Sequence, residues 1–312
     1  IKVEKCYTLK PVHKKILYII NPIAGTGSFN QLKKTIERTT HAAGIPFECI
    51  TSNVSANYTA VKAKIKEEGF TDVVIAGGDG TVSQVINALR ETAIQFGILP
   101  VGSGNGLART AKIPIDPQEA MKLIFKETGK PTDGFSVNGQ FACMLSGLGF
   151  DATVAHSFAR QSTRGFYTYA KEVIKKIGGA TPYLFKVSVE GYTLSLQAYM
   201  ISIANANQYG NNFTIAPFAK LNDGLLDVFI LLKQSKTSMF WQTLKQLLGH
   251  NPITQTGVHA PASKILHWQT AALTIQNKEG AALHIDGDPA PLENELTIRV
   301  LPQAFRLIRN NN

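Results

Sequence analysis

The chain has 312 residues, of which 44% are apolar, and a formal net charge of +10 at pH 7. This length and apolar content suffice for a large core and favour two domains. The positive charge favours an anionic partner, such as a nucleotide or an anionic membrane surface. Nucleic acid is not expected, because the basic residues are spread over helical faces and form no block with interleaved aromatics.

The cysteine pattern and the length of the apolar runs predict a cytoplasmic protein. Cys6, Cys49 and Cys143 are widely spaced and form no C-x-x-C pair, which argues against a disulfide framework and a zinc site. No uncharged apolar run reaches the roughly 18–20 residues that span a bilayer. We therefore expect a cytoplasmic protein that reaches any membrane peripherally.

The first part of the chain alternates predicted strands with predicted helices. Such alternation indicates a mostly parallel sheet with helices on its faces, and sheets of this kind bind ligands at the carboxyl ends of their strands. The predicted strands are Ile16–Ile20, Phe47–Thr51, Asp72–Ala76 and Gln95–Val101, and the predicted helices follow Ser28 and cover Thr59–Glu68 and Val82–Glu91.

Beyond Pro131 the segments become short, often alternate apolar and polar residues, and are separated by Gly, Asn, Asp and Pro, which indicates antiparallel strands. We place a domain boundary near residues 131–134, with an α/β domain over 1–133 and a β-rich domain over 134–303. We expect residues 304–312 to return to the first domain. The predicted strands are Phe185–Val189, Leu194–Ala204, Leu225–Leu232, Ala271–Gln276, Ala281–Ile285 and Glu295–Val300, and the predicted helices are Tyr167–Lys176 and Ser238–Leu248.

The most informative stretch is Gly77-Gly78-Asp79-Gly80-Thr81, which lies between a predicted buried strand and a predicted helix. Its glycines let an anion approach backbone N–H groups, and the helix directs the positive end of its dipole to the same place. We therefore predict a phosphate site. A carboxylate there repels phosphate unless Mg²⁺ lies between them or the carboxylate handles a proton, so Asp79 is a candidate for either role. The plainer alternative is a helix cap.

Two further loops follow predicted strands and should gather with Thr51 at the same edge of the sheet. Gly102-Ser103-Gly104-Asn105 precedes a helix, and its hydroxyl and amide can reach a ribose, a base or a phosphate. Leu107 stands where a dinucleotide fingerprint has its third glycine, which disfavours nicotinamide binding, and the Walker lysine is missing. The other loop, Asn21–Gly25, closes the first strand, where Asn bonds either to its own backbone or to a ligand.

In the β-rich half, Asp286 and Asp288 lie two residues apart at a strand end. One carboxylate of such a pair can serve as a general base while the other binds metal or orients it; the plainer interpretation is an Asp-rich hairpin turn. The turn at Asn222-Asp223-Gly224 offers a similar choice between a plain turn and a hard-cation site that uses Asp223 and backbone carbonyls.

Together these motifs resemble the diacylglycerol kinase catalytic-domain family, which includes sphingosine, ceramide and bacterial lipid kinases. The matching patterns are Asn-Pro-x-x-Gly at 21–25, Gly-Gly-Asp-Gly-Thr at 77–81, Pro-x-Gly-Ser-x-Asn at 100–105 and Asn-Asp-Gly-x-Leu at 222–226. The family's late Asp-Gly-Glu reads Asp286-Gly287-Asp288 here. The resemblance implies a nucleotide-binding α/β domain with a mostly parallel sheet and an antiparallel β-sandwich-like domain, with ATP and lipid meeting in the cleft between them.

The resemblance also implies roles for individual residues. Asp79 organises the ATP phosphates through Mg²⁺, and the proton acceptor is either Asp286 or Asp288, the latter one methylene shorter than the family's Glu. A further Mg²⁺ is implied at Asp223, with the carbonyls of Lys220 and Leu225. The candidate ATP-binding residues, from the motifs and the resemblance together, are Asn21, Pro22, Ile23, Ala24, Gly25, Thr51, Gly77, Gly78, Gly80, Thr81, Val82, Ser83, Gln84, Gly102, Ser103 and Asn105.

The expected activity is ATP- and Mg²⁺-dependent phosphorylation of a hydroxyl of a diacylglycerol- or sphingoid-like lipid, with the enzyme in contact with an anionic membrane surface. The identity of the lipid and a homodimeric assembly are left open. One alternative is a kinase of a soluble alcohol or of NAD, since such kinases also use a Gly-Gly-Asp-Gly turn. Another is a catalytically silent lipid-binding homologue.

Overall fold

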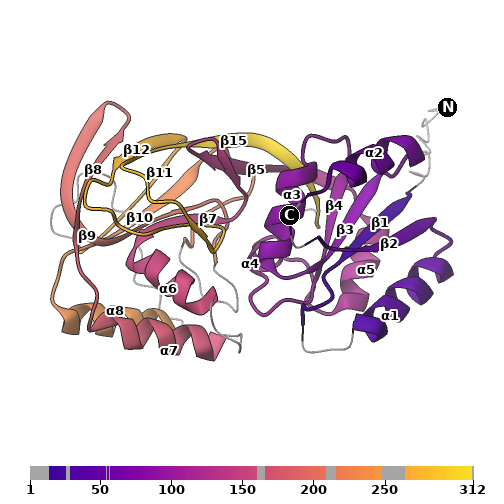
Figure 1. The fold of residues 1–312 in the computed structure, drawn as a ribbon, viewed down its shortest axis with the longest axis horizontal. Helices are drawn as coiled ribbons and strands as arrows, with labels where there is room; N and C mark the ends of the chain where they lie inside the picture. Colours follow the sequence, from indigo (N-terminus) through magenta and orange to yellow (C-terminus); the bar gives the residue numbers. More distant parts are fainter. Residues whose placement is uncertain are drawn as a thin grey trace, which may run out of the picture.

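The computed structural model shows two lobes joined by long strands (Figure 1). It describes residues 14–25, 29–53, 55, 57–159, 166–208, 216–247 and 264–310, so Cys6, residue 248 of the last predicted helix and residues 311–312 lie outside the described part.

The first lobe is built on four parallel strands in the order β4-β3-β1-β2. The strands β1 and β3 are buried along their whole length, because α1 and α5 cover one face of the sheet and α2 and α3 the other (Figure 1). The strands are β1 (Ile16–Ile20), β2 (Phe47–Thr51), β3 (Asp72–Gly77) and β4 (Gln95–Pro100), and the helices are α1 (Phe29–Ala42), α2 (Thr59–Glu68), α3 (Asp79–Leu89), α4 (Gly106–Thr110) and α5 (Pro117–Lys126).

The second lobe is antiparallel and sandwich-like, with helices at one end (Figure 1). Its core is a cluster of buried aliphatic and aromatic side chains that includes Val187, Ile201, Ile230 and Ile298. Its strands are β6 (Gln140–Ala142), β7 (Leu145–Gly149), β8 (Tyr183–Val189), β9 (Tyr192–Ala204), β10 (Leu226–Leu232), β11 (Ile265–Thr270), β12 (Ala272–Gln276), β13 (Leu283–Ile285) and β14 (Asp288–Ala290), and its helices are α6 (Phe150–Ala159), α7 (Phe166–Ile177) and α8 (Lys236–Leu247).

Two strands connect the lobes: β5 (Gly129–Val137) and β15 (Glu295–Ile308), which pair antiparallel along most of their length. β15 begins in the second lobe beside β12 and ends in the first, where Leu307 pairs in parallel with Phe96 of β4. Residues 131–134, where the sequence suggests a domain boundary, lie inside β5 rather than in a linker. The division at residue 133 stays a prediction.

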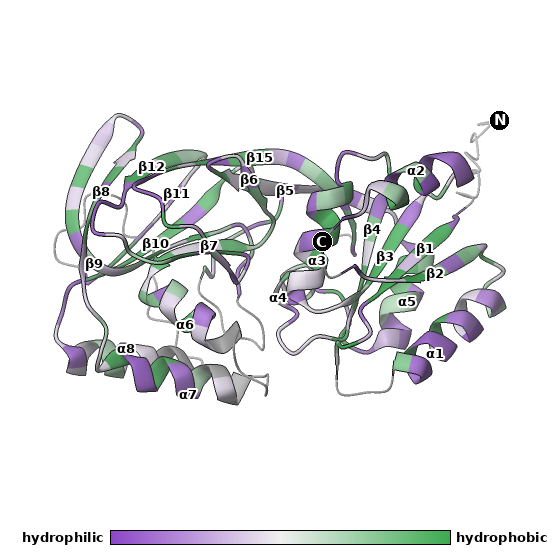
Figure 2. Cartoon of the chain, in the orientation of Figure 1, coloured by the Kyte–Doolittle hydropathy of each residue, from purple (hydrophilic) through white to green (hydrophobic). Residues whose placement is uncertain are grey.

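Apolar residues lie where the strands are covered and polar residues where the helices face outward. Figure 2 shows hydrophobic colours along β1 and β3 and hydrophilic ones along α1 and α2. At the junction of the lobes, Phe305 of β15 makes edge contacts with Phe96 and Phe141, at ring-centroid distances of 6.2 and 6.4 Å. An aromatic cluster therefore fixes the end of β15 against the first lobe.

Candidate functional site

The glycine turn and the second glycine loop touch backbone to backbone at the carboxyl edge of the first-lobe sheet. Their strands end side by side, with Gly77 opposite Pro100. A Cβ added to Gly102 would overlap Gly78 Cα and lie 3.1 Å from Gly78 N. Because carbon contacts normally lie near 3.5–4.0 Å, the second loop needs glycine at position 102, whereas a Cβ on Gly78 would lie 3.4 Å from Gly102 Cα. The two predicted phosphate loops therefore form one surface.

The Asn21 loop joins that surface through its amide. Asn21 Nδ2 donates to Thr81 Oγ1 at 2.7 Å, and Asn21 Oδ1 accepts the backbone N–H of Ile23 at 3.1 Å. Gly77 leaves room for Thr81, because a Cβ on Gly77 would lie 2.8 Å from Thr81 Cβ. From the sequence, the Asn21 side chain bonds either to its own backbone or to a ligand. In the structure it bonds to the backbone of its own loop, at Ile23, and to Thr81 of the glycine turn.

Asp79 stands in the first turn of α3, which begins three residues earlier than predicted, with Gly78 as its N-cap residue. The backbone N–H groups of Asn105, Gly106 and Leu107 bond to the Asp79 carboxylate. Burial nevertheless raises the Asp79 pKa to about 6, with a smaller contribution from the nearby charge of Asp286. The side chain retains partial solvent exposure, so Asp79 joins the two glycine loops at the edge of the site.

The Asp286 carboxylate is almost buried and accepts hydrogen bonds from both lobes. Oδ1 accepts the backbone N–H groups of Met144 at 2.9 Å and Leu145 at 3.0 Å. Oδ2 accepts the N–H of Cys143 at 2.9 Å and the hydroxyl of Ser83, a residue of α3, at 2.5 Å. These four donors and the Cys143 thiol, whose Sγ lies 3.5 Å from Oδ2, use the lone pairs with which a general base would take a proton. This carboxylate is suited to holding the lobes together.

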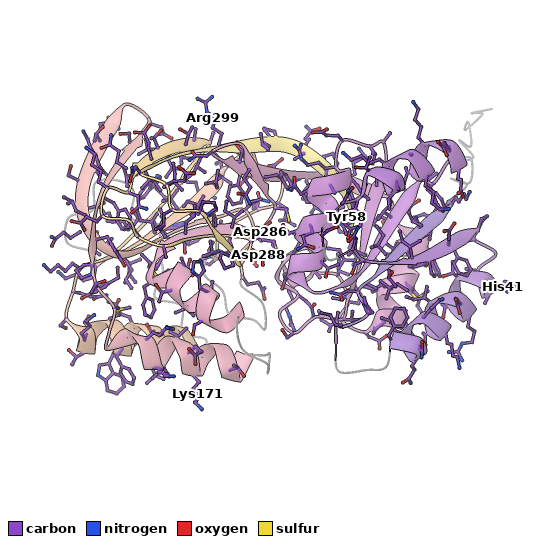
Figure 3. All side chains as sticks on the ribbon, in the orientation of Figure 1. His41, Tyr58, Lys171, Asp286, Asp288 and Arg299 are labelled. Atoms are coloured by element: carbon purple, nitrogen blue, oxygen red, sulfur yellow. The ribbon has the colours of Figure 1, made fainter. Side chains whose placement is uncertain are left out.

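Asp288 contrasts with Asp286, although both belong to one tight hairpin between β13 and β14. Asp286 and Gly287 have φ of 50° and 89°, which is typical of an Asp-Gly type I′ turn. The Asp288 side chain is exposed, and Figure 3 shows Asp286 and Asp288 where the second lobe faces the first. Asp286 and Asp288 therefore belong to a hairpin turn and also lie where a general base is expected.

The other candidate ATP-binding residues differ in how far their side chains are exposed to solvent. Ser103 and Thr51 are exposed at the ends of their strands, whereas Val82 is buried. Asn105 is buried, with φ of 57°, and its Nδ2 donates to the carbonyls of Gly102 and Pro100. The Asn105 amide therefore shapes its own loop.

The Asp223 turn lies just before β10 in the chain. Asp223 Oδ1 accepts the N–H of Leu225 at 3.1 Å, and burial raises the Asp223 pKa. Together with the carbonyls of Lys220 and Leu225, this carboxylate would be an all-oxygen donor set, which suits Mg²⁺. Among the described residues, no group of three or more His, Cys, Asp or Glu side chains gathers as a metal site. A metal at Asp223 stays a prediction.

Sequence reasoning missed two sets of contacts at the site. The N–H groups of residues 143–145, which bind Asp286, lie in a segment without turn or motif residues. Asp133 is also buried, and its carboxylate accepts the N–H groups of Gly224 and Gln303, both at 2.8 Å. It therefore ties the Asp223 turn to β15. Because the sequence favours a domain boundary rather than a strand at residues 131–134, it carries no sign of this role.

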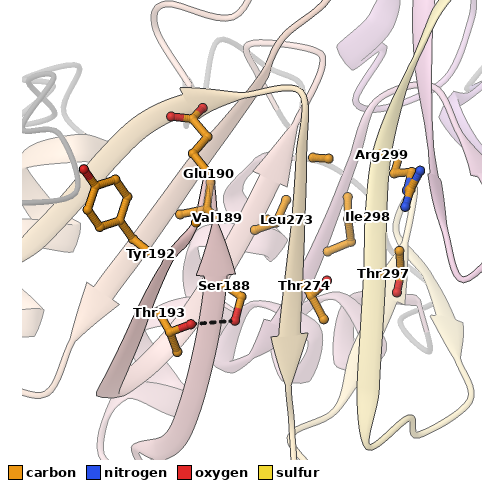
Figure 4. Close-up of a pocket in the computed structure, with 12 residues that line it drawn as sticks. Ser188, Val189, Glu190, Tyr192, Thr193, Leu273, Thr274, Thr297, Ile298 and Arg299 are labelled. Atoms are coloured by element: carbon orange, nitrogen blue, oxygen red, sulfur yellow. Dashed lines mark hydrogen bonds between the residues drawn. The ribbon is translucent and has the colours of Figure 1, made fainter.

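A shallow groove of about 290 Å³ lies on the outer side of the second lobe, between the β8–β9 hairpin, β12 and β15 (Figure 4). Its walls carry Ser188, Thr193, Thr274 and Thr297, with Glu190 and Arg299 at the rim. None of the predicted site residues lines it.

Two touching glycine loops that face carboxylates from a second lobe are an arrangement expected of a phosphotransferase. The sequence model of the diacylglycerol kinase catalytic domain matches residues 15–137. The model of the YegS C-terminal NAD kinase β-sandwich-like domain matches residues 145–309, which is by itself more than half of the chain. The chain belongs to this family of lipid kinases.

Individual relatives agree with this assignment. A protein named "Probable lipid kinase YegS-like" from Pseudomonas aeruginosa (strain UCBPP-PA14) is 29% identical over 256 residues, 77% of this chain and 76% of that protein. The diacylglycerol kinase of Bacillus subtilis (strain 168) is 23% identical, with 88% and 90% covered. A crystal structure of a diacylglycerol kinase from Bacillus anthracis str. Sterne superposes with a TM-score of 0.75 at 22% identity, covering 96% of this chain and 98% of the other. The likeness in structure shows the shared fold.

Proposed function

We propose that the chain transfers the γ-phosphoryl group of ATP, with Mg²⁺, to a hydroxyl of a diacylglycerol- or sphingoid-like lipid. The observation that carries the proposal is the meeting of three loops from the first lobe, at Gly78, Gly102 and Asn21, opposite the Asp286–Asp288 hairpin of the second. Nucleotide phosphates would take the backbone N–H groups of the glycine loops and the first turn of α3.

Asp79 would hold Mg²⁺ beside the phosphates. The fit rests on its carboxylate, which keeps partial exposure at the edge of the site while three N–H groups fix it from behind. When bound, Mg²⁺ neutralises charge on the phosphate oxygens. The glycine loops would meanwhile hold the γ-phosphoryl group in line with the lipid hydroxyl, and such positioning supplies most of the catalysis in phosphoryl transfer.

Asp288 is our choice of proton acceptor. The lipid oxygen attacks the γ-phosphorus, the bond to the bridging oxygen breaks, ADP leaves, and the hydroxyl proton goes to the Asp288 carboxylate. Asp286 is the less suitable base because its oxygens already accept from Ser83 and from the N–H groups of residues 143–145. It would serve instead to place the hairpin against α3.

Peripheral membrane contact would use the α7–α8 surface, which we define as Lys171, Ile174, Lys175, Trp241 and Lys245. The two helices lie side by side at one end of the second lobe (Figure 1). Ile174 and Trp241 are 41% and 60% exposed, and the three lysines are exposed as well. Apolar side chains among lysines fit the interface of an anionic bilayer. None of the helices in the described part of the chain is long and apolar enough to cross one.

The test is transfer of labelled phosphate from ATP to a panel of diacylglycerol, sphingosine, ceramide, phosphatidylglycerol, undecaprenol, glycerol and NAD. Label in a lipid product that depends on Mg²⁺ supports the proposal, and label confined to glycerol or NAD contradicts it. Binding of lipid without ATP affinity or transfer would instead indicate a silent homologue.

The choice of base is tested by two matched variants. Asp288→Asn should lower kcat by about 10²–10⁴-fold, the usual contribution of a general base, with little change in melting temperature because the side chain is exposed. Asp286→Asn should lower the melting temperature, since it removes a buried charge that the Ser83 hydroxyl, three backbone N–H groups and the Cys143 thiol stabilise. Full activity of Asp288→Asn would contradict the assignment.

A further inference from the structure

A buried imidazole holds the hairpin of Asp286 and Asp288 from behind. His284 lies on β13, two residues before Asp286, and is fully buried. Its Nδ1 accepts the backbone N–H of Gly287 at 3.2 Å. The His284 side chain therefore folds back onto the turn that follows β13. Its hydrogen bond is to Gly287, the residue directly before Asp288.

The other ring nitrogen faces a buried carboxylate. His284 Nε2 lies 3.3 Å from Asp151 Oδ2, and Asp151, on α6, also accepts the hydroxyl of Ser202 on β9. Since Nδ1 accepts a hydrogen bond, the neutral ring carries its proton on Nε2; this tautomer follows from the bond at Nδ1, because the contact of Nε2 with Asp151 lacks hydrogen-bond geometry. The charge of Asp151 beside Nε2 favours a proton on that nitrogen, which leaves Nδ1 to accept from Gly287.

The surroundings allow this pair little freedom to shift. A Cβ on Gly147 would lie 2.7 Å from His284 Nε2 and would overlap the Asp151 carboxylate, so β7 closes the space beside them. Ser146 Oγ donates to the His284 carbonyl at 2.7 Å, and His156 Nε2 lies 2.9 Å from the Leu283 carbonyl, to which it can only donate. The backbone of β13 is therefore fixed on both sides of the imidazole.

We infer that His284 is a positioning residue for phosphoryl transfer: its Nδ1 fixes the Gly287 peptide and so sets where Asp288 presents its carboxylate. The inference rests on the proposed function, in which Asp288 takes the hydroxyl proton. Asp151, which accepts from Ser202, acts on His284 through its charge beside Nε2. A shift of a base by about 1 Å is enough to cost about 10²-fold in rate, so the imidazole governs turnover without touching substrate.

The test compares two replacements of His284, each of which keeps a polar group near only one of the two ring nitrogens. His284→Asn keeps an acceptor near the position of Nδ1, whereas His284→Gln keeps an amide near Nε2 and loses the acceptor for Gly287. We expect kcat of His284→Gln to fall by about 10²-fold with an unchanged KM for ATP, and His284→Asn to retain most of the activity. Equal losses in the two variants, or an unchanged kcat in His284→Gln, would overturn the inference.

His267→Gln is the matched control. His267 is another fully buried histidine of the second lobe; its Nε2 lies 2.7 Å from Asp227 Oδ1, and it belongs to β11, which pairs with β10. It should lose stability as His284→Gln does but keep kcat. If both variants lose the same kcat, the effect is one of general stability and the inference fails.

Nitrogen NMR of the histidine-labelled wild-type protein gives a second readout that needs no folded variant. The His284 resonances should show a protonated Nε2 and an unprotonated Nδ1 at neutral pH; a proton on Nδ1 would overturn the inference. The outcome is separable from the proposed function. A wild-type enzyme without transfer to any lipid refutes the proposed function, whereas an active enzyme with the Nδ1–H tautomer refutes only the role of His284.

Discussion

Replacing Gly102 with Ala tests whether the two glycine loops form one phosphate surface. The new Cβ would overlap Gly78 Cα and lie 3.0 Å from Asn105 Oδ1, and the atoms it meets are mostly backbone. To reach normal contact the loops must part by about 1 Å. A displacement of that size costs about 10²-fold in rate where the loops position the phosphoryl group, and overpacking costs about 1–3 kcal/mol of stability.

The assay is ATP affinity by calorimetry together with the rate of label transfer and the melting temperature. Gly178→Ala is the matched control, because a Cβ there meets no atom within 4 Å and Gly178 lies in the second lobe. It should leave ATP affinity unchanged. If Gly102→Ala keeps full ATP affinity and full kcat, the loops do not act together on the nucleotide and the argument from their closeness is wrong.

Three further outcomes follow from burial and charge. Burial raises the Asp79 pKa from 3.8 to about 6, so the stability from its protonated form is present below about pH 4 and is lost as the pH rises through about 6. In urea denaturation without nucleotide, the unfolding free energy of the wild type relative to Asp79→Asn should fall over that window by at most about 3 kcal/mol; a difference independent of pH would contradict the burial of this carboxylate. Asp133→Ala leaves the N–H groups of Gly224 and Gln303 without their acceptor and should lower the unfolding free energy by about 2–4 kcal/mol, whereas a loss below about 0.5 kcal/mol would mean that water replaces the carboxylate. Replacing Trp241 with Ser and Lys171 with Glu should reduce sedimentation with vesicles containing phosphatidylglycerol, while leaving transfer to detergent-dispersed lipid intact; unchanged vesicle binding would exclude the α7–α8 surface as the membrane contact.

Much of the first lobe follows from sequence because its strands are buried apolar runs that end at clear breaks. Ile16–Ile20 was predicted to the residue, since Asn21-Pro22 ends the run. The helix α5 was not predicted, although Asp116 caps it and Pro117 occupies its first position, a known start pattern. The sequence therefore contains the signal for this helix.

The length of β15, the strand β5 and the partners of Asp286 depend on contacts between distant segments, which local sequence patterns do not predict. β15 extends past the predicted Val300 to Ile308, through Pro302 and a bulge between Leu301 and Phe305 that breaks the alternation. β5 contains Pro131 and Gly134, which favour a turn, yet pairing with β15 makes it a strand. At the site, the loops gather as the alternation predicts, but the partners of Asp286 lie more than 140 residues away along the chain. Only tertiary structure shows them.

For Ser83, the contact predicted from the sequence differs from the contact seen in the structure, and a variant can distinguish the two. The sequence places it among the ATP-binding residues, whereas its hydroxyl donates to Asp286 Oδ2 at 2.5 Å and so links α3 to the acceptor hairpin. Ser83→Ala would remove one of five donors to a nearly buried carboxylate and should cost about 1.5–3 kcal/mol of stability.

The two roles predict different kinetics for this variant. If Ser83 acts through Asp286, kcat falls while the KM for ATP stays constant, because the hairpin shifts relative to the glycine loops and the nucleotide site is unchanged. A raised KM for ATP with unchanged kcat would mean that the hydroxyl leaves Asp286 to bind phosphate. Ser83→Thr, which keeps the hydroxyl, should restore the wild-type kcat in the first case. In that case Asp286 couples the nucleotide lobe to the acceptor lobe without exchanging a proton itself.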